Sequence, residues 1–151
     1  MLEFETAEHI RTFVGHKQSV YDCVVTRDGS QLISASRDKL VIVWNTSDGS
    51  RLHILEGHDS VVRGLCLTID ESFLFSASWD SSIMIWNLEN GQSVGKMKGH
   101  PKDINSCVLT SSNSKLFSAS DDKTIKMWGN RTLFENNFAL FFRFKVENEA
   151  S

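Results

Sequence analysis

Short runs of apolar residues alternate with polar turn residues along most of this chain. The runs are five to seven residues long, and Val, Ile, Leu and Trp are frequent in them. Runs of this length and composition are typical of β-strands and are too short for helices. The first group consists of SVYDCVV at 19–25, QLISAS at 31–36, LVIVW at 40–44 and RLHIL at 51–55.

The residues between the runs favour tight turns. Asp28-Gly29, Asp48-Gly49 and Asn90-Gly91 are dipeptides that accept the positive φ of hairpin turns. The single proline, Pro101, lies in a connecting segment and interrupts no run. Strands joined by such short turns pair antiparallel, so the pattern predicts four-stranded meanders.

Four markers recur along the chain at one fixed spacing. Gly15-His16 returns as Gly57-His58 and as Gly99-His100, so 42 residues separate each copy from the next. The tripeptide Ser-Ala-Ser, an Asp two residues after it and a Trp eight residues after it keep the same spacing. Self-similarity at a period of this length indicates a repeat architecture, in which one structural unit occurs three times.

The order Gly-His, Ser-x-Asp, then Trp-Asn or Trp-Gly resembles the WD-repeat family of β-propellers. The family's usual Trp-Asp pair is replaced here by Trp44-Asn45, Trp86-Asn87 and, as a larger departure, Trp128-Gly129. The resemblance implies an all-β chain that forms an incomplete β-propeller of three four-stranded WD-type blades.

The resemblance also implies boundaries within the chain. The repeat region is expected at 1–130, with repeats at 7–48, 49–90 and 91–130, followed by a divergent Phe-rich tail at 131–151. In family terms, residues 8–14 are the outer strand of a preceding blade, and residues 50–56 and 92–98 are its equivalents.

Each repeat contains a Ser, a His and an Asp, the residue types of a hydrolase triad. A catalytic set is needed once in a protein, whereas this set occurs three times with a Trp added. The resemblance instead implies a structural hydrogen-bond network in each blade, with Ser34 favoured over Ser36. A serine hydrolase that uses one set is the less favoured alternative. The tetrads are His16, Ser34, Asp38 and Trp44; His58, Ser76, Asp80 and Trp86; and His100, Ser118, Asp122 and Trp128.

Recognition is expected where the repeats differ, because packing occupies the blade cores. Trp79 is the one tryptophan outside the 42-residue spacing, and its equivalents are Arg37 and Asp121. In the family, this position and the start of the first strand face the side used for partners, and Trp, Tyr and Arg are enriched at hot spots. Packing of Trp79 on a neighbouring loop is the equally weighted alternative. The resemblance adds Tyr21, Arg63 and Asn105, with Ser19, Val61 and Asp103 two residues earlier.

Composition narrows the class of partner. The 151 residues carry 16 Lys and Arg against 19 Asp and Glu, a net charge of −3, so no basic excess is present to neutralise nucleic acid. The chain has no run of 18 apolar residues and no signal-peptide pattern at its start. We therefore expect protein partners, no nucleic acid, no membrane span and a cytoplasmic or alternatively nuclear location, with no cofactor or metal implied.

The three cysteines are expected to be buried thiols. Cys23, Cys66 and Cys107 form no C-x-x-C motif, and each lies inside an apolar run. A functional role would require two of them to be paired, or one to lie beside a histidine base.

Three repeats are too few for a closed ring, since propellers typically have four to eight blades. The repeat stops after Trp128, and five of the ten phenylalanines fall in the tail that follows. Three explanations stay open: a fragment or short isoform of a longer propeller protein, which is favoured; a self-assembling half ring; or a tail that replaces a missing blade. In the half ring, residues 8–14 of one chain would complete the third blade of the other.

Overall fold

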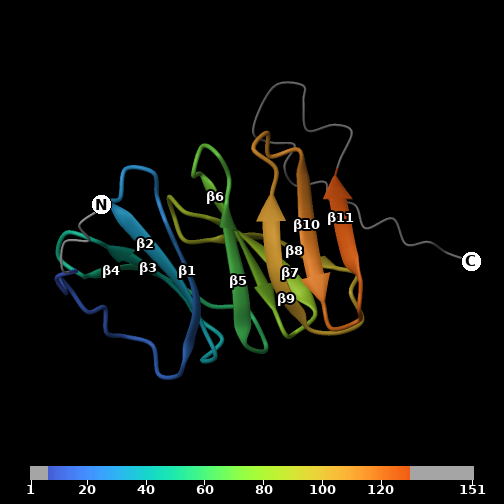
Figure 1. Cartoon of the computed structure of the whole chain (residues 1–151), viewed down its shortest axis with the longest axis horizontal. Coiled ribbons are helices and arrows are strands. Elements are labelled where there is room, and N and C mark those ends of the chain that lie inside the picture. The colour runs from blue at the N-terminus through green and yellow to red at the C-terminus, as the bar shows by residue number, and fades with distance from the viewer. Residues whose placement is uncertain (1–6, 130–151) are drawn as a thin grey trace, which may run out of the picture.

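The computed structural model describes residues 7–129, and all regular elements in this range are β-strands. The strands form three antiparallel sheets that stand side by side (Figure 1). Each sheet corresponds to one repeat, so the predicted all-β architecture of WD-type blades is confirmed.

The three sheets share one topology, in which neighbours along the chain are neighbours in the sheet. The first sheet contains β1 (Val20–Val25), β2 (Gln31–Ser36), β3 (Val41–Asn45) and β4 (Arg51–Leu55). The second contains β5 (Val62–Leu67), β6 (Phe73–Ser78), β7 (Ser82–Asn87) and β8 (Ser93–Lys98). The third contains, among the residues described, β9 (Ile104–Leu109), β10 (Lys115–Ser120) and β11 (Ile125–Gly129). The place expected for its fourth strand, and the tail at 131–151, lie outside the described residues.

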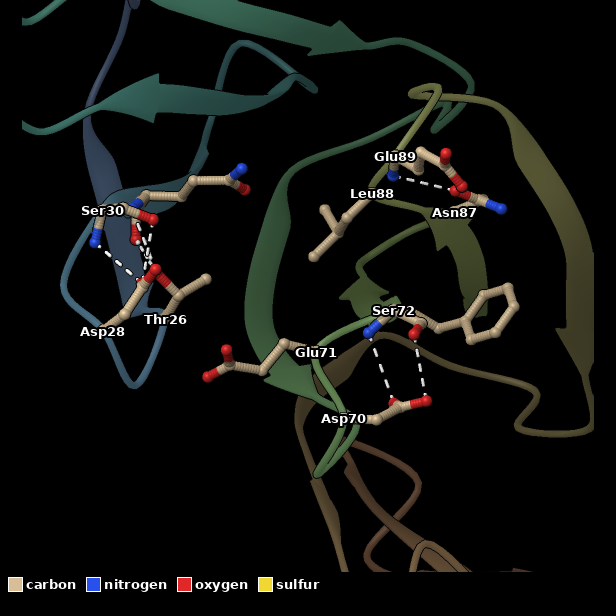
Figure 2. Close-up of a pocket in the computed structure, with 11 residues that line it drawn as sticks. Thr26, Asp28, Ser30, Asp70, Glu71, Ser72, Asn87, Leu88 and Glu89 are labelled. Atoms are coloured by element: carbon tan, nitrogen blue, oxygen red, sulfur yellow. Dashed lines mark hydrogen bonds between the residues drawn. The ribbon is translucent and has the colours of Figure 1, made fainter.

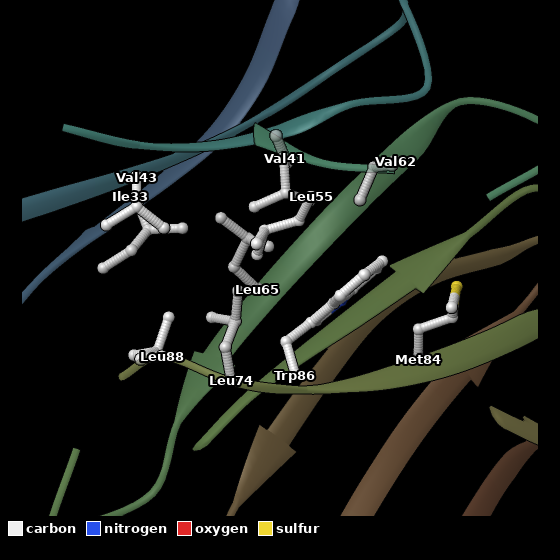
Figure 3. Close-up of a cluster of buried hydrophobic side chains, with 11 residues drawn as sticks. Ile33, Val41, Val43, Leu55, Val62, Leu65, Leu74, Met84, Trp86 and Leu88 are labelled. Carbon is white, nitrogen blue, oxygen red and sulfur yellow. The ribbon is translucent and has the colours of Figure 1, made fainter. Parts of the chain in front are cut away.

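The apolar core lies between the sheets rather than within one of them. Each sheet has a leading face, which packs on the preceding sheet, and a trailing face, which packs on the following one. Between the first two sheets, the trailing side chains Ile33, Val41 and Val43 contact a cluster that includes Val62 and Leu65 of β5 (Figure 3). Phe75, Ile83 and Ile85 occupy the same trailing positions in the second sheet and pack with Ile104 and Cys107 of β9.

Residues 8–14 do not form the outer strand that the resemblance implied. No strand is assigned between residues 7 and 19, whereas the equivalents β4 and β8 pair with β3 and β7. A strand needs a neighbour for its hydrogen bonds, and the described residues offer no third strand of a preceding blade here. Instead, Arg11 donates hydrogen bonds to the carbonyl oxygens of Ser47 and Asp48, in the turn between β3 and β4.

The expectation of three buried thiols is also wrong for two of them. Cys107 is buried, but Cys66 is only half-buried and Cys23 is exposed. Cys23 is the equivalent of Leu65 and Cys107, which a preceding sheet covers, and in the part of the chain described here no sheet covers the leading face of the first blade.

Candidate functional site

The structure brings together the four side chains of each tetrad. In the second sheet, His58 Nδ1 lies 2.8 Å from Asp80 Oδ2, His58 Nε2 lies 2.7 Å from Ser76 Oγ, and Trp86 Nε1 donates to the same hydroxyl at 2.8 Å. The first and third tetrads repeat this chain of contacts, with His–Asp distances of 2.9 and 2.6 Å.

Local register explains why these four residues meet. Ser34 on β2 lies opposite Ile42 on β3, so Trp44, two residues further on, points to the same face as Ser34. Asp38 lies in the β2–β3 turn and accepts hydrogen bonds from the backbone N–H groups of Lys17 and Leu40. Ser36 has a separate contact, because its Oγ bonds to the Gln18 carbonyl and the Asp38 N–H.

The glycine before each histidine is explained by close contact with a neighbouring side chain. A Cβ atom at Gly15 would lie 2.7 Å from Trp44 Cη2, and one at Gly99 would lie 2.6 Å from Trp128 Cη2. At Gly57 the obstruction is Met84 Cε, at 2.8 Å. The glycines of the first and third tetrads therefore leave the room that the indole ring occupies.

The electrostatics of the tetrads keep the carboxylates ionised. Burial raises the pKa of Asp38, but hydrogen bonds from the Lys17 backbone and from His16 more than offset it, so the net pKa is lowered. The pKa of Asp80 is lowered in the same way, with burial opposed by bonds from His58 and Ser82. Hydrogen bonds, first from the Thr124 hydroxyl and then from His100, lower the pKa of Asp122 to about 2.

An ionised carboxylate only accepts hydrogen bonds, so each His Nδ1 carries the proton that it shares with Asp. With a neutral ring, Nε2 then accepts the proton of the serine hydroxyl, while tryptophan donates to the serine oxygen. Ser34, Ser76 and Ser118 are all buried, and both functions of their hydroxyls are occupied. The geometry leaves no open side from which a substrate could reach Oγ. Among residues 7–129, no cluster of His, Cys, Asp and Glu could hold a metal ion.

A second group of residues lies on one rim of the blades, where the first strand of each sheet begins. The pairing register shifts at Tyr21, Arg63 and Asn105, the residues skipped between Val20 and Asp22, and at the equivalent positions in β5 and β9. Such a β-bulge re-aims a side chain away from the regular alternation of the strand. The three bulges therefore turn equivalent residues toward this rim.

The rim side chains form one connected strip. The Arg63 guanidinium carbon lies 4.6 Å from the centre of the Tyr21 ring, and the Tyr21 and Trp79 rings are 6.3 Å apart. Trp79 Nε1 donates to Asn105 Oδ1 at 2.9 Å, and Asn105 Nδ2 donates to Asp121 Oδ1 at 2.6 Å. These five residues, here called the Trp79 strip, cross all three sheets.

The other residues expected at this rim have different positions. Arg37 is exposed, with no side-chain contact to the Trp79 strip among the interactions described. The carbonyls of Ser19, Val61 and Asp103 accept hydrogen bonds from the backbone N–H groups at 37, 79 and 121, at 2.9 to 3.0 Å. Ser19 is exposed and Asp103 half-buried, but the Val61 side chain is buried and so is not part of the rim surface.

The opposite rim holds a cavity of about 380 Å³ that the sequence did not single out. Asp28, Asp70, Glu71 and Glu89 line it (Figure 2). The two aspartates accept hydrogen bonds from Ser30 and Ser72 of their own turns, so these carboxylates stabilise the turns themselves. Asp-x-Ser at each turn is the sequence signal for this arrangement.

Comparisons with known proteins support the repeat assignment. A family described as "WD domain, G-beta repeat" matches residues 7–45, 49–87 and 91–129. A 40-residue stretch is 42% identical to the small ribosomal subunit protein RACK1 of Saccharomyces cerevisiae, covering 26% of this chain and 12% of that protein. A 45-residue stretch is 40% identical to a component protein of chromatin assembly factor 1 of Mus musculus, covering 30% of this chain and 8% of that protein.

Solved structures with the same fold include the crystal structure of the RRP9 WD40 repeats and the structure of U3-55K. Each superposes with a TM-score of 0.75 at 29% sequence identity, over 79% of this chain. The chain spans only 38% of each of these structures. Residues 7–129 contain no helix that is long and apolar enough to cross a membrane. From three matched repeats, three blade-like sheets and this structural likeness, we conclude that the chain belongs to the WD-repeat (WD40) family.

Proposed function

We propose that this chain is a non-enzymatic scaffold that binds protein partners through the Trp79 strip. The observation that carries the proposal is the continuity of the strip, which links aromatic, cationic and amide side chains of all three blades on one rim. Trp, Tyr and Arg are the residue types in which binding energy concentrates. All are half-buried here, so their orientation is fixed before a partner arrives.

The relatives favour the same class of function. One is named as a ribosomal subunit protein and the other as part of a chromatin assembly factor, and both names describe components of larger assemblies. We therefore place this chain in the cytoplasm, with the nucleus as the alternative. The net charge of −3 favours a protein rather than a nucleic-acid surface as the partner.

The tetrads have a structural role in this proposal. Each connects the segment before the first strand to the β2–β3 turn and to the third strand, through groups that are buried and fully hydrogen-bonded. The enzyme alternative needs a serine that a substrate can reach. A fluorophosphonate probe that labelled Ser34, Ser76 or Ser118 in the folded chain would support that alternative.

The test of the rim is affinity purification from native cells followed by mass spectrometry. Trp79→Ala and Arg63→Ala are expected to lose the same captured proteins, because both change the Trp79 strip. Glu89→Ala on the opposite rim is the matched control and is expected to keep them. The proposal fails if the rim variants, shown to be folded by circular dichroism, retain every partner, or if only the control loses partners.

Self-association is a second candidate interaction, and the two end faces of the stack favour it. Val20 on the leading face of the first sheet is 53% exposed, whereas its equivalents Val62 and Ile104 are 0% and 1% exposed. On the trailing face of the third sheet, Ile125 is 73% exposed, whereas its equivalent Ile83 is 0% exposed. The chain therefore carries both halves of an interface that it makes twice internally.

We commit to a second copy of this chain as the occupant of these faces. Two copies joined leading face to trailing face would make six blades, within the usual range of four to eight. A cavity of about 570 Å³ on the leading face, lined by Phe13, Val25 and Leu32 among others, offers room for apolar side chains. Because residues 8–14 form no strand, the proposed contact involves the sheet faces and not a strand exchange.

Light scattering tests the self-association. We expect a species of twice 17.1 kDa that Ile125→Lys converts to monomer. The control is Ile54→Lys on β4, which introduces the same charge at a site away from both end faces. A wild-type monomer at all concentrations, or equal effects of the two variants, would contradict the face-to-face contact while leaving the rim proposal standing.

A further inference from the structure

Two of the three thiols meet at the boundary between the second and third sheets. Cys66 is on β5 and Cys107 is on β9, and their Sγ atoms lie 3.5 Å apart. A disulfide has an S–S bond of about 2.05 Å, so a shift of roughly 1.5 Å would bring the two sulfurs to bonding distance. The pairing that a functional role for the cysteines would require is thus present in the fold.

A close approach of the two strands places the sulfurs together. A Cβ atom at Gly64 would lie 2.9 Å from Cα of Ser106 and 3.3 Å from the carbonyl oxygen of Asn105. The backbones of β5 and β9 are therefore in direct contact at this point. Cys66 follows Gly64 by two residues and Cys107 follows Ser106 by one, so both thiols lie beside the contact.

The two thiols differ in their access to solvent. Cys66 is half-buried, so a small oxidant can reach it, whereas Cys107 is buried. The hydrogen bond with Cys66 and burial together raise the pKa of the Cys107 thiol well above its usual value. Since the thiolate is the reactive form, Cys66 is the thiol that reacts first with an oxidant and Cys107 is the one that resolves the product.

We propose that Cys66 and Cys107 are a redox modification site that forms a reversible disulfide in the presence of a peroxide. The Cys66 thiolate attacks one peroxide oxygen, the O–O bond breaks, and Cys66 becomes a sulfenic acid as the first water leaves. The Cys107 sulfur then attacks the Cys66 sulfur, and the sulfenic hydroxyl departs with the Cys107 proton as the second water. Two thiols are oxidised and one peroxide is reduced to two waters. A small dithiol reverses the reaction by reducing the bond.

The disulfide would join the second blade to the third across 41 residues of chain. A cross-link over a loop of this length restricts the unfolded chain, so the oxidised form is expected to melt at a higher temperature than the reduced form. This role is independent of the Trp79 strip, which lies at the start of β5 and β9 and contains neither cysteine.

The experiment treats the full chain at low concentration with hydrogen peroxide, then unfolds and alkylates it and measures its intact mass. We expect one alkyl group, on Cys23, in place of three, and a thermal midpoint that rises on oxidation and falls again with dithiothreitol. Peptide mapping of the wild-type chain should recover a Cys66–Cys107 linked pair, a measurement that requires no variant.

Matched variants separate the proposed pair from other chemistry. Cys66→Ser and Cys107→Ser should abolish the intramolecular bond, whereas Cys23→Ser should leave it intact. The proposal is overturned if the wild-type chain still takes up three alkyl groups, if Cys66 stops at a sulfinic acid, or if the recovered cross-link contains Cys23.

Discussion

Replacing Asp80 by Ala tests directly whether the tetrads stabilise the fold. Asp80 accepts hydrogen bonds from His58 Nδ1, from the Asp59 N–H and from both the N–H and the hydroxyl of Ser82. The Asp59 N–H is exposed and can bond to water after the substitution. The His58 side chain is 1% exposed and Ser82 is 0% exposed, so these partners would be left without an acceptor.

The size of the effect follows from the number of orphaned groups. A buried donor that loses its acceptor costs about 1–3 kcal/mol. Two such groups, with some relaxation around the missing carboxylate, give an expected loss of about 2–4 kcal/mol in the free energy of unfolding. With a urea dependence of about 2 kcal/mol per molar, the unfolding midpoint should fall by about 1–2 M.

Asp59→Ala is the matched control for this measurement. It removes the same charge from a nearby residue, and its carboxylate is 87% exposed with a single ion pair, 3.6 Å from Lys96. Such a surface change is expected to alter the free energy of unfolding by less than about 0.5 kcal/mol. If the two variants shift the midpoint equally, the assignment of Asp80 to a buried structural network is wrong.

Three further predictions concern other parts of the blades. Gly99→Ala should destabilise the chain by about 1–3 kcal/mol through overpacking against Trp128, whereas Gly95→Ala, whose Cβ would meet Ile85 at an ordinary 3.5 Å, should not, as urea unfolding will show. Trp86→Ala should cost about 3–5 kcal/mol of stability while Trp79→Ala costs less and mainly weakens partner capture; equal costs would reduce Trp79 to packing. The folded-state pKa of Asp122, about 2, lies below its usual 3.8, so its contribution is present above pH 3.8 and is lost as pH falls toward 2; Asp122→Asn should flatten that acid limb of a thermal-melting profile.

The period of the sequence predicted most of the fold because every blade solves the same packing problem. Ile33, Ile83 and their equivalents alternate with period two, which gives strands with one buried face. The positions of Trp44, Trp86 and Trp128 could be inferred in the same way, since each is ten residues after a tetrad serine. Local pattern and tertiary contact agree at these positions, and prediction is then reliable.

The remaining features depend on contacts between repeats, which a period cannot encode. Cys66 and Cys107 are not equivalent residues, so no repeat marker links them, and only the Gly64 contact brings them together. Trp79 was expected either at a partner surface or on a neighbouring loop. The structure shows a hydrogen bond to Asn105 in the next blade, so its side chain is held in place and still borders the rim. Position in the stack also decides exposure, as it does for Cys23 against Leu65.

The end faces allow one further step about the geometry of assembly. Val108, Ile125 and Met127 are 56%, 73% and 61% exposed on the trailing face of the third sheet. Burying each would contribute about 1.5–3 kcal/mol, or roughly 4–9 kcal/mol for one interface. That is comparable with the roughly 4–15 kcal/mol of freedom lost when two proteins associate, so a dimer with one such interface is marginal. A closed ring of two chains makes two interfaces for a single loss of freedom, whereas each chain added to an open stack gains one. Closure into a defined dimer is therefore favoured over an open stack, and light scattering that shows masses increasing without limit would contradict it.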